Sequence, residues 1–278
     1  GETKEIESDY LFATVQTISK EENLKLFNKN HFDYIVIDET HRAGAKSYQN
    51  IIDWFTPKFL LGMTATPERT DGFDIFKQFE YNIAYEIRLQ KALEENMLCP
   101  FHYFGVTDIS VDNKLLDDNC DFNSLVTNER IEKIIQKSLF YGSDSEIIRG
   151  LIFCSKTEEC NQLSKLFNEK GFKTISLTGK NSEEERVEAI KKLESENFEE
   201  KLDYIFTVDI FNEGVDIPKI NQIIMLRPTQ SAIVFVQQLG RGLRKAKNKE
   251  YLTVIDFIGN YNNNYLVPIA LFGDTSYS

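Results

Sequence analysis

Short apolar runs that end in polar residues recur along this chain and alternate with stretches of helical periodicity. A strand that is apolar throughout is buried on both faces, which is the arrangement of a parallel sheet covered by helices. The sequence therefore predicts an α/β fold. Strands are expected at residues 11–15, 34–38, 59–64, 150–154, 173–178, 203–208, 222–226 and 251–257, and helices at about 19–28, 45–55, 157–171 and 182–196.

The pattern falls into two blocks. One ends near residue 107 and the other begins near residue 125, and the intervening "DISVDNKLLDDNCDFN" is acidic and lacks clear periodicity. A length of 278 residues also suits two domains. We therefore expect one domain over residues 1–107, a linker over 108–124 and a second domain over 125–278.

Composition limits the kinds of function this chain can have. The formal net charge of −12 argues against a broad polyanion-binding surface, so any contact with nucleic acid must be local. No apolar run approaches the ~20 residues of a membrane span, and the polar start does not resemble a signal peptide. The four cysteines form no C-x-x-C pair, which is typical of reduced thiols. We therefore expect a cytoplasmic protein that does not bind a membrane.

The run "YIVID" leads directly into two adjacent acids, Asp38 and Glu39. In parallel α/β sheets, ligands bind at the carboxyl ends of the strands. An acid there can hold Mg²⁺ bound to nucleotide phosphates, and a neighbouring acid can orient or deprotonate an attacking water. A second interpretation is that Asp38 only caps the following turn. This stretch by itself favours neither interpretation.

Two other strand ends carry candidate ligands. Thr64 and Thr66 in "MTATPERTDG" offer hydroxyls to the same crevice, although a turn into Pro67 also explains this stretch. In "FTVDIFNEGVDIP", Gly214 allows the backbone to approach a ligand and Asp216 can bind a ribose hydroxyl. An ordinary turn after a strand remains the alternative for this second stretch.

The stretch "VFVQQLGRGLRKAK" is more specific. Arg241 and Arg244 are three residues apart on a predicted helix and would share one face, with Gln237 one turn earlier. Gly240 and Gly242 would keep that surface open to close approach. A solvated basic helix end explains the charges but not the glycines, whereas guanidinium groups that bind phosphate explain both.

Five segments in this order, "DETH", "TATP", "LIFCSK", "TVDIFNEGVDIP" and "QQLGRGLR", resemble the superfamily 2 helicases of the DExH type. "LLGMTATPERTDG" is most similar to the restriction-type branch, which includes the motor subunits of type I and type III restriction enzymes. The resemblance implies two RecA-like parallel-sheet domains in tandem. It also implies an ATP-dependent helicase or translocase core that moves on nucleic acid, DNA rather than RNA.

The resemblance also implies roles for individual residues. Asp38 would hold Mg²⁺, Glu39 would act on the attacking water, and His41 would couple this site to the second domain. The remaining roles are coupling (Thr64, Thr66), ATP binding (Gly214, Asp216), arginine fingers (Arg241, Arg244) with Gln237 beside them, and nucleic-acid binding (Thr14, Gln16, Thr178, Thr207). The carboxyl-terminal tail is similar to a bacterial subgroup that is often fused to a phospholipase-D-like nuclease domain.

The family pattern begins with a phosphate-binding loop, G-x-x-x-x-G-K-[ST], and this sequence contains none. "SLTGKNS" at 176–182 is the nearest string, but it lacks the first glycine and the final hydroxyl. We therefore expect a fragment whose first domain is incomplete at its amino end and which is inactive alone. Two alternatives are a non-catalytic nucleic-acid-binding or regulatory module, and a metal hydrolase that uses Asp38, Glu39 and His41.

Overall fold

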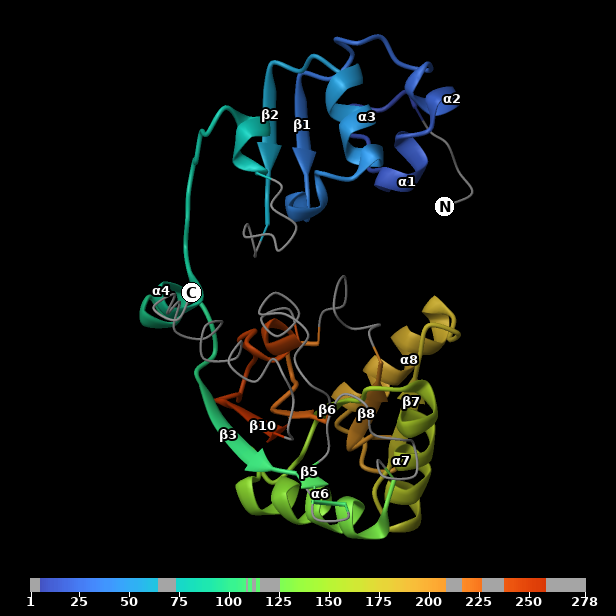
Figure 1. Ribbon diagram of the computed structural model, residues 1–278, viewed down its shortest axis with the longest axis vertical. Helices are drawn as coiled ribbons and strands as arrows, with labels where there is room; N and C mark the ends of the chain where they lie inside the picture. The colour runs from blue at the N-terminus through green and yellow to red at the C-terminus, as the bar shows by residue number, and fades with distance from the viewer. Residues whose placement is uncertain are drawn as a thin grey trace. The chain divides into compact units, whose positions relative to one another are not determined.

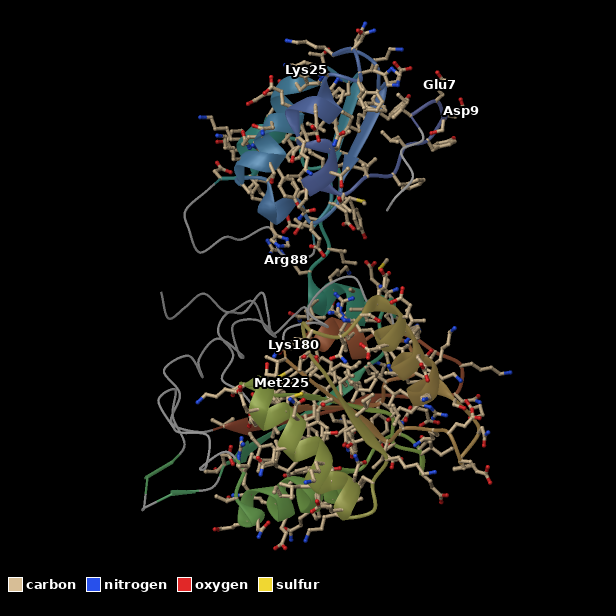
Figure 2. The ribbon with its side chains drawn as sticks, turned by 90° about the vertical axis from the view of Figure 1, so that its right-hand side faces the viewer. Glu7, Asp9, Lys25, Arg88, Lys180 and Met225 are labelled. Carbon is tan, nitrogen blue, oxygen red and sulfur yellow. The ribbon has the colours of Figure 1, made fainter. Side chains whose placement is uncertain are left out.

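The computed structural model describes residues 6–64, 74–108, 110–111, 114–115, 126–208, 217–226 and 238–258. The chain divides into two compact units, Gly1–Glu86 and Ile87–Ser278, and each is an α/β unit (Figure 1). Charged side chains such as Lys25 project outward, whereas Met225 lies inside the second unit (Figure 2). No helix in the described part of the chain is long and apolar enough to cross a membrane.

The first unit contains a two-stranded parallel sheet of β1 (Tyr34–Ile37) and β2 (Phe59–Gly62). Its helices are α1 (Val15–Ile18), α2 (Glu21–Leu24) and α3 (Lys46–Trp54), with short 3-10 turns at Thr40–Arg42 and Phe76–Phe79. Apolar residues of α2 and α3 pack together, and the inward side chain of Ile35 packs against them. These contacts form the core of this unit.

Two expectations for the first unit are wrong. β1 is not buried on both faces: Tyr34 is 72% exposed and Val36 56%, whereas Ile37 is 7% exposed. The reason is that the described helices pack against Ile35 and Ile37, so alternate side chains face outward. Residues 11–15 form no strand, because Thr14 is the N-cap of α1 and its carbonyl accepts from the amides of Thr17 and Ile18.

The second unit has a six-stranded parallel sheet in the order β3-β10-β9-β6-β8-β7. The strands are β3 (Phe101–Thr107), β6 (Gly150–Phe153), β7 (Thr174–Leu177), β8 (Tyr204–Thr207), β9 (Gln222–Met225) and β10 (Leu252–Ile258). A separate pair, β4 (Ser110–Val111) and β5 (Lys114–Leu115), is antiparallel. All residues of β6, β8 and β9 are buried, which confirms the prediction of a sheet covered on both faces.

Helices cover the two faces of this sheet. α6 (Asn128–Tyr141) and α7 (Thr157–Glu169) pack on one face, and α8 (Glu183–Glu194) packs on the other. The expected capping box of Ser182 and Glu185 begins α8, and Gly171 follows α7 with a φ of 95°. α6, β3 and α4 (Leu89–Glu94) were not predicted from the sequence.

The structure divides the chain at a different residue from the one expected. Residues 87–107 were assigned to the first domain, but β3 pairs with β10 along its whole length. Most of the expected linker at 108–124 lies outside the described residues. Cys99, Cys154 and Cys160 are buried and form no disulfide within the described part of the chain.

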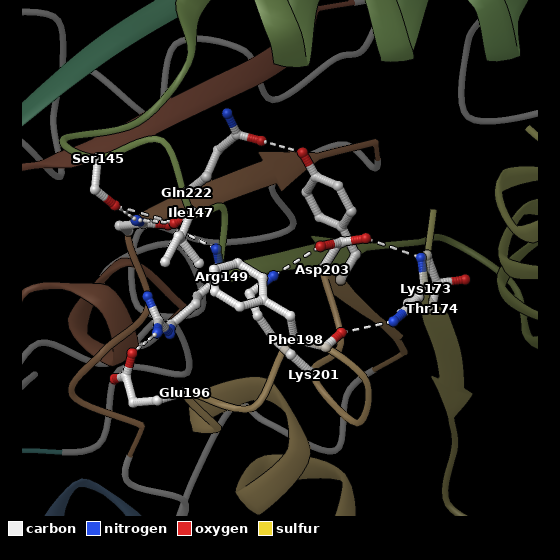
Figure 3. Close-up of polar contacts among 12 residues, drawn as sticks. Ser145, Ile147, Arg149, Lys173, Thr174, Glu196, Phe198, Lys201, Asp203 and Gln222 are labelled. Carbon is white, nitrogen blue, oxygen red and sulfur yellow. Dashed lines mark hydrogen bonds and ion pairs between the residues drawn. The ribbon is translucent and has the colours of Figure 1, made fainter. Parts of the chain in front are cut away.

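Polar side chains join neighbouring strands at the amino-terminal edge of the six-stranded sheet (Figure 3). The Asn221 side chain accepts from the Arg149 amide at 2.8 Å, and Asp203 accepts from the Lys173 amide at 2.9 Å and from the Lys201 ammonium at 2.7 Å. This edge is therefore occupied by structural contacts. The opposite, carboxyl-terminal edge is where ligands bind in open parallel sheets.

A buried ion network on Arg130 of α6 joins the ends of β3 and β9 to the first turn of α7. Arg130 donates to Asp108 (2.9 Å from Nη2), to Glu159 (2.8 Å) and to the Leu226 carbonyl, and all three charged side chains are 0% exposed. Desolvation opposes the charge on Arg130, but the carboxylates of Asp108 and Glu159 outweigh it and raise the pKa of Arg130 above its usual value.

We expect Arg130→Met to lower the free energy of unfolding by about 3–5 kcal/mol, because it leaves two buried carboxylates without their partner. Urea unfolding of the parent and variant chains measures this change. Lys170→Met is the control, since it removes an exposed pair with Glu132 that contributes at most about 1 kcal/mol. Equal effects of the two substitutions would contradict the assignment of a buried network.

Candidate functional site

The first unit presents Asp38 and Glu39 at the carboxyl end of β1. The Asp38 side chain is exposed, and its Oδ1 accepts a hydrogen bond from the Glu39 amide at 2.9 Å. Glu39 has a φ of 52°, in the left-handed region that non-glycine residues adopt mainly where the surroundings enforce it. This backbone turns the chain sharply after the strand.

Thr40 joins the ends of β1 and β2. Its hydroxyl donates to the Ile37 carbonyl at 2.8 Å, and its amide donates to the Met63 carbonyl at 2.9 Å. A Cβ on Gly62 would lie 2.8 Å from the Thr40 hydroxyl, so this close approach requires glycine. The sequence pattern did not point to Thr40 or Gly62, although a glycine inside a strand is a signal of close backbone approach.

His41 links the segment that follows β1 to the segment that follows β2. Its Nδ1 lies 3.2 Å from a Glu39 carboxylate oxygen and 3.1 Å from the Thr64 hydroxyl, 23 residues away in the chain. The His41 side chain is 12% exposed, so the contact is largely shielded from water. The structure thus brings Glu39, His41 and Thr64 together, while Thr66 lies outside the described residues.

The acids fit the ligand preference of Mg²⁺. Mg²⁺ bound to a nucleotide needs only one or two protein carboxylates, because phosphates and waters supply the other ligands. Asp38 is exposed and can serve as that carboxylate, whereas Glu39 is directed to His41. A metal hydrolase of Asp38, Glu39 and His41 would need these three side chains grouped around one ion. Within the described residues, no three His, Cys, Asp or Glu side chains are grouped in that way.

In the second unit, the two candidate arginines are not on one helical face. Residues 238–242 are helical, so Arg241 is in the helix and Arg244 lies beyond its end. Buried Leu239 and Leu243 anchor the segment in the core, while Arg241 is partly exposed and Arg244 is exposed. The expectation of a shared helical face is therefore wrong, because the helix ends after Gly242.

The two glycines of this segment also differ from each other. A Cβ on Gly240 would meet nothing within 4 Å, which agrees with an open surface. A Cβ on Gly242 would lie 2.6 Å from Leu252, so Gly242 is required for packing against β10 and not for ligand approach. Gln237, Gly214 and Asp216 lie outside the described residues.

The four candidate nucleic-acid contacts have different exposures. Thr14 and Gln16 are exposed, and the Thr14 hydroxyl lies 2.8 Å from that of Thr17. Thr178 follows β7 and Thr207 ends β8, as predicted, but they are only 6% and 0% exposed. In this conformation Thr207 therefore presents no surface to a polymer, and Thr178 presents very little.

Comparison with known families matches both parts of the chain. Residues 1–69 match the family described as "Type III restriction enzyme, res subunit". Residues 129–246 match the "Helicase conserved C-terminal domain". The two matches include the acidic box in the first unit and both arginines in the second.

Two curated relatives match most of the chain. A Saccharomyces cerevisiae protein assigned as the ATP-dependent helicase IRC3 is 29% identical over 265 residues, which is 91% of this chain and 37% of that protein. The type I restriction enzyme EcoAI endonuclease subunit of Escherichia coli is 26% identical over 277 residues, 85% of this chain and 33% of that subunit. The chain therefore spans less than half the length of these relatives.

Among solved structures, a fragment assigned to the HsdR subunit of a type I restriction enzyme from Vibrio vulnificus has the same fold. The TM-score is 0.67 at 22% identity, with 89% of this chain and 47% of that chain covered. The α/β units of this chain are thus RecA-like, as the sequence analysis expected.

Proposed function

Because this chain belongs to the superfamily 2 helicases, in the branch that contains restriction-enzyme motor subunits, we propose that it is part of the ATP-hydrolysing core of a nucleic-acid translocase. The observation that carries the proposal is the convergence of Glu39, His41 and Thr64 at the carboxyl ends of β1 and β2. A carboxylate held by a histidine that is itself in contact with a hydroxyl is suited to orient a water beside a phosphate.

The proposed chemistry assigns one task to each side chain. Asp38 holds Mg²⁺, which when bound neutralises charge on the nucleotide phosphates. Glu39 orients the attacking water and accepts its proton. Arg241 and Arg244, with Gln237, are proposed to stabilise charge that develops on the phosphoryl group, and Gly214 and Asp216 are proposed to bind the nucleotide.

His41 and Thr64 are proposed to couple hydrolysis to movement. The Thr64 hydroxyl lies within hydrogen-bonding distance of His41, and His41 in turn contacts Glu39. The position of Glu39 is therefore linked to the segment after β2, in which Thr66 follows Thr64 by two residues. A shift of that segment would therefore change the orientation of Glu39. Such a contact would make hydrolysis depend on the conformational state of the motor.

DNA is the proposed polymer. The match to restriction-enzyme families supports DNA over RNA. With a net charge of −12, binding would depend on a narrow path of hydroxyls, amides and main-chain donors, including Thr14 and Gln16. A nuclease domain fused to or associated with this core is a further part of the proposal.

The proposal is tested by ATP hydrolysis with and without oligonucleotides. Because the 278-residue sequence contains no phosphate-binding loop, we expect it to hydrolyse ATP at background rate. A form of the protein that includes such a loop should hydrolyse ATP, and single-stranded DNA should stimulate it more than RNA of the same length. A colorimetric phosphate assay measures both effects.

The regulatory alternative predicts a different result. A non-catalytic module would bind oligonucleotides but would not hydrolyse ATP even in a form that contains the loop. Rapid ATP hydrolysis by the 278-residue chain alone would contradict the role assigned to the loop.

A further inference from the structure

The Lys249 side chain donates hydrogen bonds to three main-chain carbonyls, which belong to two separate segments of the chain. Its ammonium donates to the carbonyls of Gly242 at 2.5 Å, Arg244 at 3.0 Å and Pro218 at 3.0 Å. Gly242 and Arg244 belong to the arginine segment, whereas Pro218 lies two residues after Asp216 in the chain. One side chain therefore connects the arginine segment to Pro218, which follows the candidate nucleotide-binding residues Gly214 and Asp216 in the sequence.

The Gly242 carbonyl needs a donor because the helix at 238–242 ends there. The last carbonyls of a helix have no amide partner within the helix, and a cation near them is favourable. Burial lowers the pKa of Lys249 to about 8. The ammonium is therefore still protonated at neutral pH, with the three donors that three carbonyls require.

A tight turn brings Lys249 back to the helix end. Asn248 has a φ of 64°, a left-handed conformation that asparagine tolerates well, and the Lys249 amide donates to the Ala246 carbonyl at 3.2 Å. The next residue, Glu250, is held by its amide to Asp144 at 2.8 Å before β10 begins. The local backbone thus directs the Lys249 side chain towards the arginine segment.

We propose that Lys249 is a positioning residue: through its hydrogen bonds to Gly242, Arg244 and Pro218 it fixes the main chain of Arg244 relative to residues 217–221. This inference rests on the proposed function, in which the arginine segment and the sequence segment that ends at Pro218 bind nucleotide. Arg244 lies two residues beyond Gly242, the last helical residue. The ammonium constrains the main chain there directly, at the Arg244 carbonyl.

The six-stranded sheet does not depend on these bonds. Its core is formed by buried side chains of the strands, α8, Leu239 and Leu243. Removal of the ammonium should therefore loosen residues 217–222 and 238–247 and leave β6 and β8 unchanged. A general loss of stability would affect all these regions together.

Hydrogen exchange with mass spectrometry on the 278-residue chain tests the proposal. In Lys249→Met, exchange should rise at least about tenfold in peptides over 217–222 and 238–247, the effect of losing a charged hydrogen-bond donor. Lys249→Arg retains a cationic donor and should restore most of the protection. Lys247→Met removes an exposed charge from the same turn and should have no effect.

Three results would overturn the proposal: unchanged exchange in Lys249→Met, an equal rise in β6 and β8, or no rescue by Lys249→Arg. If Lys249→Met does not fold, Lys249→Gln replaces it, and failure of both to fold would also contradict a local role. The test needs no ATP, so its failure is distinct from failure of the proposed function. If exchange responds as expected but Arg244→Ala leaves ATP hydrolysis unchanged, only the proposed function is wrong.

Discussion

Arg244→Ala lowers the rate of ATP hydrolysis by about 10³- to 10⁵-fold in a form of the protein that contains a phosphate-binding loop; this is the expected result for an arginine finger. Arg244 is exposed beyond the end of the 238–242 helix, where its guanidinium can reach a ligand without disturbing the core. Steady-state kinetics at saturating ATP and DNA measure the change.

Lys245→Ala is the matched control for Arg244→Ala. Lys245 is the adjacent residue and is also exposed, and its ammonium donates to the Asn96 side chain at 2.7 Å. Its replacement by alanine removes a positive charge, as the replacement of Arg244 does. Hydrolysis should change little in this variant. If Arg244→Ala behaves like Lys245→Ala, Arg244 is not the finger, and the same comparison applies to Arg241.

Glu39→Gln should reduce hydrolysis by about 10²- to 10⁴-fold, the contribution typical of a general base. ATP binding should persist, because Asp38 is the residue proposed to hold Mg²⁺. The amide of Gln keeps the size of the side chain and can still bond to His41, so the left-handed turn at Glu39 should be preserved. Binding of a fluorescent ATP analogue, measured beside the hydrolysis rate, separates the two effects.

Glu22→Gln provides the control for Glu39→Gln. Glu22 is an exposed carboxylate on α2 of the same unit, and its substitution removes one negative charge without touching the site. A Glu39→Gln variant that hydrolyses ATP as fast as Glu22→Gln would exclude Glu39 as the base. Loss of nucleotide binding in Glu39→Gln would instead indicate that Glu39, and not Asp38, holds the metal.

The six-stranded sheet of the second unit was largely predictable from the sequence. β6, β8 and β9 are continuous apolar runs, and such runs are stable only when helices cover both faces of the sheet. The acids after β1 and the Thr64 hydroxyl after β2 could likewise be placed at one sheet edge from the order of the elements. The chemistry proposed for these side chains follows from their residue types, which the sequence gives directly.

Other features depended on contacts between distant residues. β3 is unremarkable as a sequence, and it belongs to the second unit only because it pairs with β10 about 150 residues later in the chain, as the Tyr103–Asp256 bond within that pair shows. Residues 11–15 are apolar enough for a strand, yet a strand needs a paired neighbour, and Thr14 begins a helix instead. Local propensity was overridden in both cases.

The sequence by itself determined the α/β class, the order of the motifs and the identity of the acids and arginines, because hydrophobic periodicity and residue chemistry are local properties. Only the tertiary structure decided that His41 lies between Glu39 and Thr64, that Gly242 is a packing residue, and that Lys249 connects two segments. Each of these depends on distances across the fold, and spacing along the chain does not encode such distances.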